Sequence, residues 1–324
     1  MGSGVWSVNT YKARANQRGG QDAFAYSKGA SGVHPTLNPY GLEVRESRDS
    51  AEHPDSNSII VGLDVTGSMG NVIRAIHSDL PQLLGLLLDR KYIPHPQINF
   101  SAFSNGTCDS VAVQVGQFES DNRMDMHLEN FIIGGALAGG CDTRESAELM
   151  FYFAANHTSI DCWEKRKRKG YLFVISDEPG YDTIKKEEIE RIFNRKLKDD
   201  IPFEQIVAQV KERYHVFFII PTETSAGRDP ATHQFWRSYL SPQNVILLNH
   251  GDDVSEIIAL TIGLTERTIT LEQGLEHLRA AGKPEYQIDE LLQALSVLDA
   301  GGVKGAGTLA DNDTDTNARG TKRL

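Results

Sequence analysis

Four short runs of apolar residues, most of them β-branched or aromatic, place the strongest constraint on how this chain folds. Such runs are typical of strands buried on both faces of a sheet, because no position along them is left to face water. Segments with helical periodicity lie between the runs, which favours a parallel sheet joined by crossover helices. The four runs are Ser58–Asp64, Tyr171–Ser176, Val216–Ile220 and Val245–Leu248.

The clearest helical pattern follows the first run, where Ile73, Ile76 and Leu80 precede further leucines at spacings of three and four residues. Pro81 lies inside this pattern, and we expect a kink there because proline lacks a backbone donor and crowds the preceding turn. The same reasoning predicts helices over residues 121–133, 145–155, 185–198, 203–213, 232–239 and 254–264.

Two more strands are predicted at residues 98–103 and 111–115, with the turn-forming pair Asn105-Gly106 between them. A hairpin at this point makes one edge strand antiparallel to its neighbour. The sequence therefore predicts a doubly wound, Rossmann-like α/β sandwich, with a mostly parallel central sheet and one antiparallel edge strand.

Composition divides the chain into four segments. Residues 1–57 are polar but carry scattered aromatics, and we expect an extended N-terminal arm that packs on the domain in places. Residues 58–265 hold the α/β pattern. Residues 266–300 predict a C-terminal helical extension of two helices, 271–281 and 286–298. Residues 301–324 are rich in Gly, Asp, Asn and Thr, and predict a disordered tail.

Charge and cysteine content exclude several classes of function. The 33 basic and 44 acidic residues give a net charge of −11, which disfavours binding to nucleic acid or to an anionic membrane. No apolar run is long enough to span a bilayer, and residues 1–10 lack the apolar core of a signal peptide. Cys108, Cys141 and Cys162 are few and odd in number, so we expect unpaired thiols and a cytoplasmic location.

Polar residues gather where the predicted strands end. Asp64, Thr66 and Ser68 follow the first run, Asp177 follows the second, and the pair Asp142-Thr143 begins a helix. Ligands collect at the carboxyl ends of the strands in open parallel sheets, so these side chains are expected at one edge. Their hydroxyl and carboxylate oxygens suit Mg²⁺, Mn²⁺ or Ca²⁺ rather than zinc or copper.

The segment Asp64-Val65-Thr66-Gly67-Ser68 resembles the DxSxS motif of von Willebrand factor A (vWA) domains. Thr143 resembles the separate metal-binding threonine of that family, and Asp177 its later strand-end aspartate. The three pieces occur in the family's order, and the resemblance covers roughly residues 58–265. It implies a metal-ion-dependent adhesion site. Thr66 and Ser68 would ligate the ion, Thr143 would ligate it directly or through water, and Asp64 and Asp177 would act through bound waters.

The resemblance also implies what such a site does. Ligands that are mostly neutral leave the ion much of its charge, and an open position then attracts an acidic side chain of a partner protein. Cytoplasmic proteins of the family resemble subunits or adaptors of multi-protein machines, often beside AAA+ ATPases. We therefore expect metal-dependent protein binding, with Mg²⁺, or else Mn²⁺ or Ca²⁺, as the ion, and no catalysis.

Several other interpretations stay open. Glu178 could act as a base toward a metal-bound water, which would make the protein a hydrolase. The site could instead be an empty scaffold, with Ser68 capping the following helix. Nucleotide binding is disfavoured, because neither GxGxxG nor a P-loop is present. An aspartyl nucleophile of the haloacid dehalogenase type would need an aspartate where Thr66 stands. The charged run Glu164–Lys169 predicts a solvated loop or a docking patch.

Overall fold

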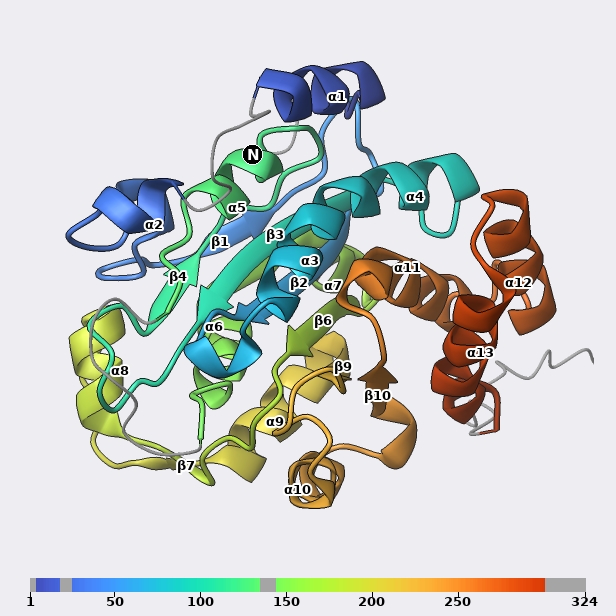
Figure 1. Cartoon of the computed structure of the whole chain (residues 1–324). Coiled ribbons are helices and arrows are strands. Elements are labelled where there is room, and N and C mark those ends of the chain that lie inside the picture. The colour runs from blue at the N-terminus through green and yellow to red at the C-terminus, as the bar shows by residue number, and fades with distance from the viewer. Residues whose placement is uncertain (1–3, 18–24, 135–143, 301–324) are drawn as a thin grey trace, which may run out of the picture.

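A central sheet of six strands organises the computed structural model, which describes residues 4–17, 25–134 and 144–300 (Figure 1). The strand order is β10-β9-β6-β2-β3-β4, and every neighbouring pair is parallel except β3 and β4. The predicted fold class, including its antiparallel edge strand, is confirmed. The strands are β2 (Asn57–Asp64), β3 (Pro96–Phe103), β4 (Val113–Val115), β6 (Gly170–Ile175), β9 (Tyr214–Pro221) and β10 (Val245–Leu248).

Helices cover both faces of this sheet, and the strand residues alternate between the two resulting cores. In β2, Ile59, Val61 and Leu63 pack into one core and Ile60 packs into the other. This double burial explains why the middle of the strand, from Ile59 to Leu63, carries no polar side chain. The first face carries α3 (Val72–Asp79), α4 (Leu83–Arg90), α5 (Met124–Glu129) and α11 (Val254–Thr265). The second carries α6 (Glu148–Asn156), α8 (Lys186–Phe193), α9 (Phe203–Arg213) and α10 (Pro230–Tyr239).

The predicted interruption at Pro81 is confirmed, because a short 3₁₀ turn, Leu80–Gln82, separates α3 from α4. Two predicted helices are shorter than expected. The segment 121–133 is helical only over α5, because the Gln114 side chain binds both backbone groups of Ile132 and holds it outside the helix. The segment 185–198 is helical only to Phe193, where Asn194 takes a left-handed conformation (φ 56°) that ends α8.

The N-terminal segment is not simply extended, which corrects the prediction for residues 8–17 and 25–29. These form α1 (Val8–Gln17) and α2 (Ala25–Gly29), and a 3₁₀ turn follows at Pro35–Leu37. The Trp6 ring rests on α4 at Gly85, where an added Cβ would lie 2.6 Å from the ring. Contacts of this kind join segments that are far apart in the sequence, so they produce no periodic sequence pattern from which the arrangement could be predicted. Further along, β1 (Arg45–Ser47) pairs with β5 (Thr158–Ile160) in a separate parallel ladder.

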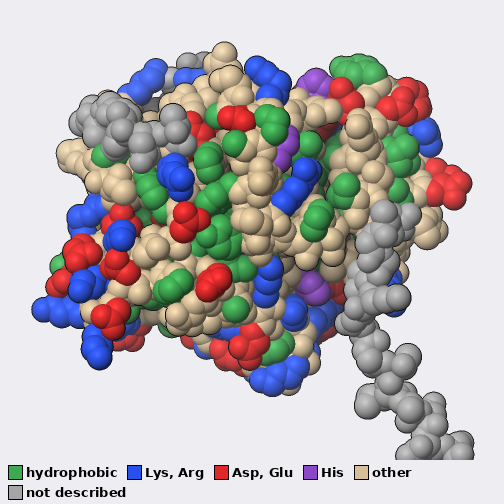
Figure 2. Space-filling model, turned by 90° about the horizontal axis from the view of Figure 1, so that it is seen from below, with side chains coloured by type: hydrophobic (Ala, Val, Ile, Leu, Met, Phe, Trp, Pro, Cys, Tyr) green, Lys and Arg blue, Asp and Glu red, His purple; other side chains and the backbone are tan. Residues whose placement is uncertain are grey.

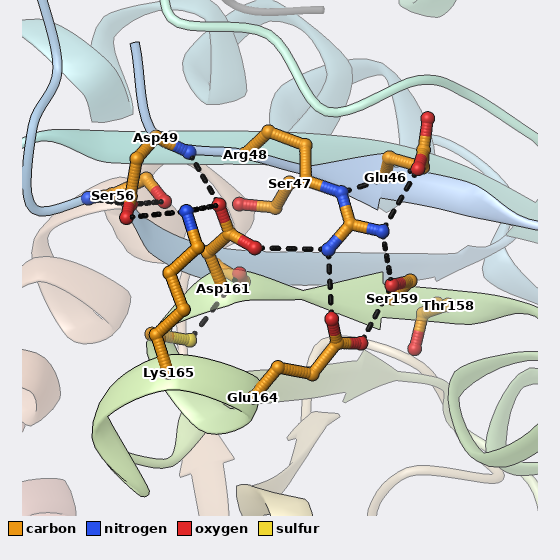
Figure 3. Close-up of polar contacts among 12 residues, drawn as sticks. Glu46, Ser47, Arg48, Asp49, Ser56, Thr158, Ser159, Asp161, Glu164 and Lys165 are labelled. Carbon is orange, nitrogen blue, oxygen red and sulfur yellow. Dashed lines mark hydrogen bonds and ion pairs between the residues drawn. The ribbon is translucent and has the colours of Figure 1, made fainter.

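The charged run is not a solvated loop, because its first part belongs to α7 (Asp161–Arg166) and because Glu164, Lys165, Arg166 and Arg168 form ion pairs. Arg166 binds Asp49 at 2.8 Å, and Lys165 contacts Asp49 and Asp161. Arg48 donates to Glu46, Asp161, Glu164 and Ser159, as Figure 3 shows. Single exposed pairs contribute less than about 1 kcal/mol, but a shared network restrains its side chains jointly. The run therefore fastens the segment after β1 to α7.

The two predicted C-terminal helices are present as α12 (Leu271–Ala280) and α13 (Glu285–Ala300). A capping box between Thr270 and Gln273 begins α12. Lys283, between the helices, pairs with Asp253 and Glu256 of the domain. Buried Ile288, Leu291 and Leu295 continue the first core, so the extension packs back on the domain. The predicted tail, 301–324, lies outside the described residues.

The cysteines differ from expectation. Cys162 is a buried free thiol, but Cys108 is disulfide-bonded, so the prediction that all the thiols are unpaired is wrong. Cys141 lies outside the described residues.

Among the described helices, none has the length and apolar character needed to cross a membrane. On the face shown in Figure 2, basic and acidic side chains are interspersed rather than gathered into a field of one sign. Two short strands, β7 (Thr183–Ile184) and β8 (Ile201–Pro202), complete the described ladders.

Candidate metal site

The end of β2 brings together the first three predicted residues. Asp64 is fully buried, and its Oδ1 accepts hydrogen bonds from the backbone N–H (2.9 Å) and the hydroxyl (2.6 Å) of Thr66. The Thr66 Oγ1 lies 3.0 Å from the Ser68 Oγ. The expectation that the side chains at 64, 66 and 68 converge is met. Ser68 lies in a short 3₁₀ turn, Gly67–Met69, and Asn71 rather than Ser68 precedes α3.

The two residues that directly follow the neighbouring strand β6 supply the next two side chains. Ser176 donates its hydroxyl to Asp64 Oδ2 at 2.6 Å, and Ser68 donates to Asp177 Oδ1 at 3.0 Å. The parallel pairing of β2 and β6 aligns Leu63 with Ile175, so the residues that follow emerge side by side. Four of the five predicted site residues are in or beside this group. The fifth, Thr143, lies outside the described residues, as does Asp142.

Sequence reasoning missed three residues near this group. Ser176 is one; its place between a buried strand and Asp177 is a signal that could have found it. Thr224, in the loop after β9, is another, and it favours the ionised form of Asp177 and so lowers its pKa, against the larger effect of burial. Glu145 is the third, and its backbone N–H donates to Pro179 O at 3.1 Å, close to Asp177 in the chain. No motif pointed to Glu145, because a long stretch of sequence separates it from the loop that it contacts.

The group is strongly acidic and buried. Burial and then the charge of Asp177 raise the pKa of Asp64 to about 7. Burial also raises the pKa of Asp177. The pKa of Glu145 rises to about 10, through burial and then the charges of Asp64, Glu178, Asp109 and Asp177. Among the described residues, no Lys, Arg or His forms an ion pair with Asp64, Asp177 or Glu145. A cation bound here would offset this repulsion.

The donor set fits a hard divalent cation. The Oδ2 of Asp177 and the Oε2 of Glu145 are buried and have no hydrogen-bond partner within the described part of the chain. That part contains no group of three His, Cys, Asp or Glu side chains close enough to form a metal cage by themselves. A site here would therefore combine hydroxyl oxygens with carboxylates at longer range, as for an ion that keeps several waters.

Glu148 of α6 contacts the loop that follows Asp177. This fully buried carboxyl accepts a hydrogen bond from the backbone N–H of Tyr181 at 3.2 Å, and burial raises its pKa to about 8. In the unfolded chain the carboxyl ionises near its ordinary value of 4.5, while in the folded protein it stays neutral until about 8. The folded state therefore binds more protons in this interval, and stability falls as pH rises through it.

Between pH 5 and pH 8, we expect the free energy of unfolding to fall by roughly 4 kcal/mol less in Glu148→Gln than in wild type. The reason is that the glutamine amide stays neutral at every pH, so burying it costs the same throughout this interval. Urea unfolding at several pH values measures the slope. Glu212→Gln, an exposed position on α9, serves as the control. Equal slopes in wild type and Glu148→Gln would show that the buried carboxyl is not the cause.

Comparison with known protein families gives no match, and no curated protein matches the sequence. Solved structures resemble the fold at low identity. The pilus adhesin SpaC of Lactobacillus rhamnosus GG has a TM-score of 0.45 at 9% identity, covering 71% of this chain and 33% of the adhesin. Proximal thread matrix protein 1 from the mussel byssus has 0.40 at 11%, covering 71% and 47%. BatB of Bacteroides thetaiotaomicron, titled a conserved hypothetical protein, has 0.41 at 11%, covering 66% and 100%.

The chain therefore spans about a third of the adhesin and about half of the byssus protein. These likenesses assign no family. What stands is an α/β fold with a mostly parallel sheet, whose carboxyl edge gathers Asp64, Thr66, Ser68 and Asp177.

Proposed function

We propose that this protein is a vWA-type module that binds a divalent cation, Mg²⁺ or else Mn²⁺ or Ca²⁺, through Thr66 and Ser68, and uses the ion to bind a protein partner. The observation that carries the proposal is the 3.0 Å distance between the two hydroxyl oxygens. Adjacent ligands of an octahedral Mg²⁺ at about 2.0–2.1 Å lie roughly 3 Å apart.

The surrounding hydrogen bonds prepare these oxygens as ligands. Thr66 has Asp64 as its acceptor, and Ser68 has Asp177. With both protons given to carboxylates, the lone pairs of the two hydroxyl oxygens are available to a cation. Ser176 holds the second oxygen of Asp64 and so fixes that carboxylate in place. These second-layer contacts do what outer partners do in other metal sites, which is to orient the ligands.

A bound ion would supply positive charge at the edge of the sheet. We propose that a carboxylate of the partner protein completes its coordination. Thr143, as the resemblance to vWA domains implies, belongs to the same ligand set. An AAA+ ATPase is the partner class that this resemblance suggests.

Calorimetric titration of Mg²⁺ into wild type and Asp64→Ala tests the metal site. We expect saturable binding by wild type and none by the variant, because Asp64 holds the Thr66 ligand. A pull-down with and without EDTA, using purified candidate ATPases and an acidic control protein, tests the partner. Identical titrations for the two proteins would rule out the metal site. Capture that is insensitive to EDTA would rule out binding through the ion.

A further inference from the structure

Two histidines face each other at the end of the sheet opposite to the candidate metal site. The Nδ1 atom of His53 lies 3.4 Å from the Nδ1 atom of His95. His53 comes shortly before β2 and His95 directly before β3, while Asp64 ends β2 at the other edge. The histidine pair therefore takes no part in the site built around Asp64.

A hydrogen bond of His53 fixes which of its ring nitrogens carries the hydrogen. Its Nε2 lies 2.9 Å from the carbonyl oxygen of Gly4, which can only accept, so Nε2 is the donor. The neutral ring then has its lone pair on Nδ1, the atom that faces His95. Histidines that bind metal ions are oriented in the same way, because the nitrogen that does not bind the ion donates to a carbonyl or carboxylate. The buried His53 ring is thus already held in the form of a ligand.

The backbone holds His95 opposite this lone pair. Pro94 and Pro96 flank His95, and proline restricts both its own φ and the residue before it. His95 has a φ of 43°, in the left-handed region that residues other than glycine seldom adopt. Its carbonyl oxygen accepts the backbone N–H of Asn57, at the start of β2, at 3.0 Å. Backbone strain of this kind persists only where the surrounding structure enforces it, and it is concentrated at functional sites.

The spacing of the two rings suits one tetrahedral ion. With zinc–nitrogen bonds of about 2.0–2.1 Å, two imidazoles on a tetrahedral zinc have their nitrogens about 3.3 Å and their centroids about 5.2 Å apart. Here the nitrogens are 3.4 Å and the centroids 5.5 Å apart. Adjacent nitrogens of a square-planar or octahedral ion with similar bonds would lie only about 2.9 Å apart. The observed distances are therefore closer to tetrahedral coordination.

We propose that His53 and His95 form a second metal site, which binds Zn²⁺ through both Nδ1 atoms. In the metal-free protein, the Nδ1–H of His95 donates to the Nδ1 of His53. Zinc takes the place of this hydrogen, and the proton passes through solvent to the Nε2 of the half-buried His95, so both rings stay neutral. In the described part of the chain no third His, Cys, Asp or Glu side chain is close enough to join them, so water fills the other two positions.

A bound ion would also restrain the N-terminal segment. The carbonyl oxygen of Gly4 accepts from His53 and from the Ser120 hydroxyl, the latter at 2.9 Å. Fixing the His53 ring on zinc therefore strengthens the attachment of Gly4 to the domain. This inference does not depend on the proposed function.

The test is calorimetric titration of Zn²⁺ into wild type, His53→Ala, His95→Ala and His233→Ala. His233 is a matched control, because its Nε2 also donates to a backbone carbonyl, that of Gly227 at 2.8 Å, but none of the described histidines pairs with it. We expect each substitution in the pair to lower zinc affinity at least about tenfold, and His233→Ala to bind as wild type does. Co²⁺ in place of Zn²⁺ should give wild type the strong visible absorption of tetrahedral cobalt, and His95→Ala should lose it.

Thermal unfolding without metal establishes that each variant folds. His95→Ala leaves the contact of His53 with Gly4 in place, so it decides the matter if His53→Ala does not fold. Unchanged zinc affinity in a folded His95→Ala would overturn the inference, and so would an equal loss in His233→Ala or no zinc binding by wild type. Asp64→Ala should bind zinc normally. Loss of Mg²⁺ binding together with normal zinc binding concerns the edge site alone, whereas loss of zinc binding in Asp64→Ala would contradict a separate histidine site.

Discussion

Asp177→Asn is expected to lower the affinity for Mg²⁺ about a hundredfold while making the metal-free protein more stable. The carboxylate accepts the Ser68 hydroxyl, has a buried oxygen without a partner, and raises the pKa of Asp64 by its charge. Asparagine keeps the shape and the acceptor but removes the charge. An ion then loses a compensating anion, and metal-free Asp64 loses a repelling neighbour.

The two effects have opposite signs, which separates a functional residue from a structural one. Calorimetry gives the affinity, and thermal unfolding at pH 8 with EDTA gives the stability, where we expect a rise of a few degrees. Ser176→Ala, which removes a hydrogen bond to Asp64 without changing charge, is the comparison and should lower stability. A less stable metal-free Asp177→Asn with unchanged affinity would mean that Asp177 serves the fold alone.

Trp236→Ala should destabilise the protein by about 3–5 kcal/mol, the range found when large buried aromatics are removed. The Trp236 ring is fully buried and stacks on Phe218, with ring centroids 3.6 Å apart. Its Nε1 donates to Glu178 O at 3.0 Å, so the cavity would open directly beneath the loop that follows Asp177. We therefore expect Mg²⁺ affinity to fall as well.

Urea unfolding measures the stability of Trp236→Ala. Trp236→Phe keeps an aromatic ring in the second core but loses the hydrogen bond to Glu178, so it should recover most of the stability and less of the affinity. A loss below about 1 kcal/mol in Trp236→Ala would mean that the core collapses into the vacated space.

The central sheet was predictable because each of its strands can be recognised from its own short stretch of sequence. Each buried strand is a continuous apolar run, and parallel strands place their carboxyl ends together, so Asp64 and Asp177 could be expected at one edge. Thr66 and Ser68 follow from the same argument.

What the sequence did not reveal depends on contacts between distant segments. Glu145 needs the loop at Pro179 to bring it to the site, and Gln114 ends the helix before Ile132 by binding its backbone. The charges of α7 read as solvated because Asp49, which pairs with Arg166, lies far away in the sequence. In each case the chain satisfies a polar group through tertiary structure, which no local pattern encodes.

The two border strands of the six-stranded sheet each have one side with no neighbouring strand, and this side could pair with a strand of another molecule. At one border, β4 is only three residues long, and at the other α13 packs against β10. Long, flat, uncovered border strands are templates for recruiting a strand from another chain. Here the short β4 and the covering helix leave little room for such recruitment. Self-association into fibrils by strand addition to this sheet is therefore disfavoured.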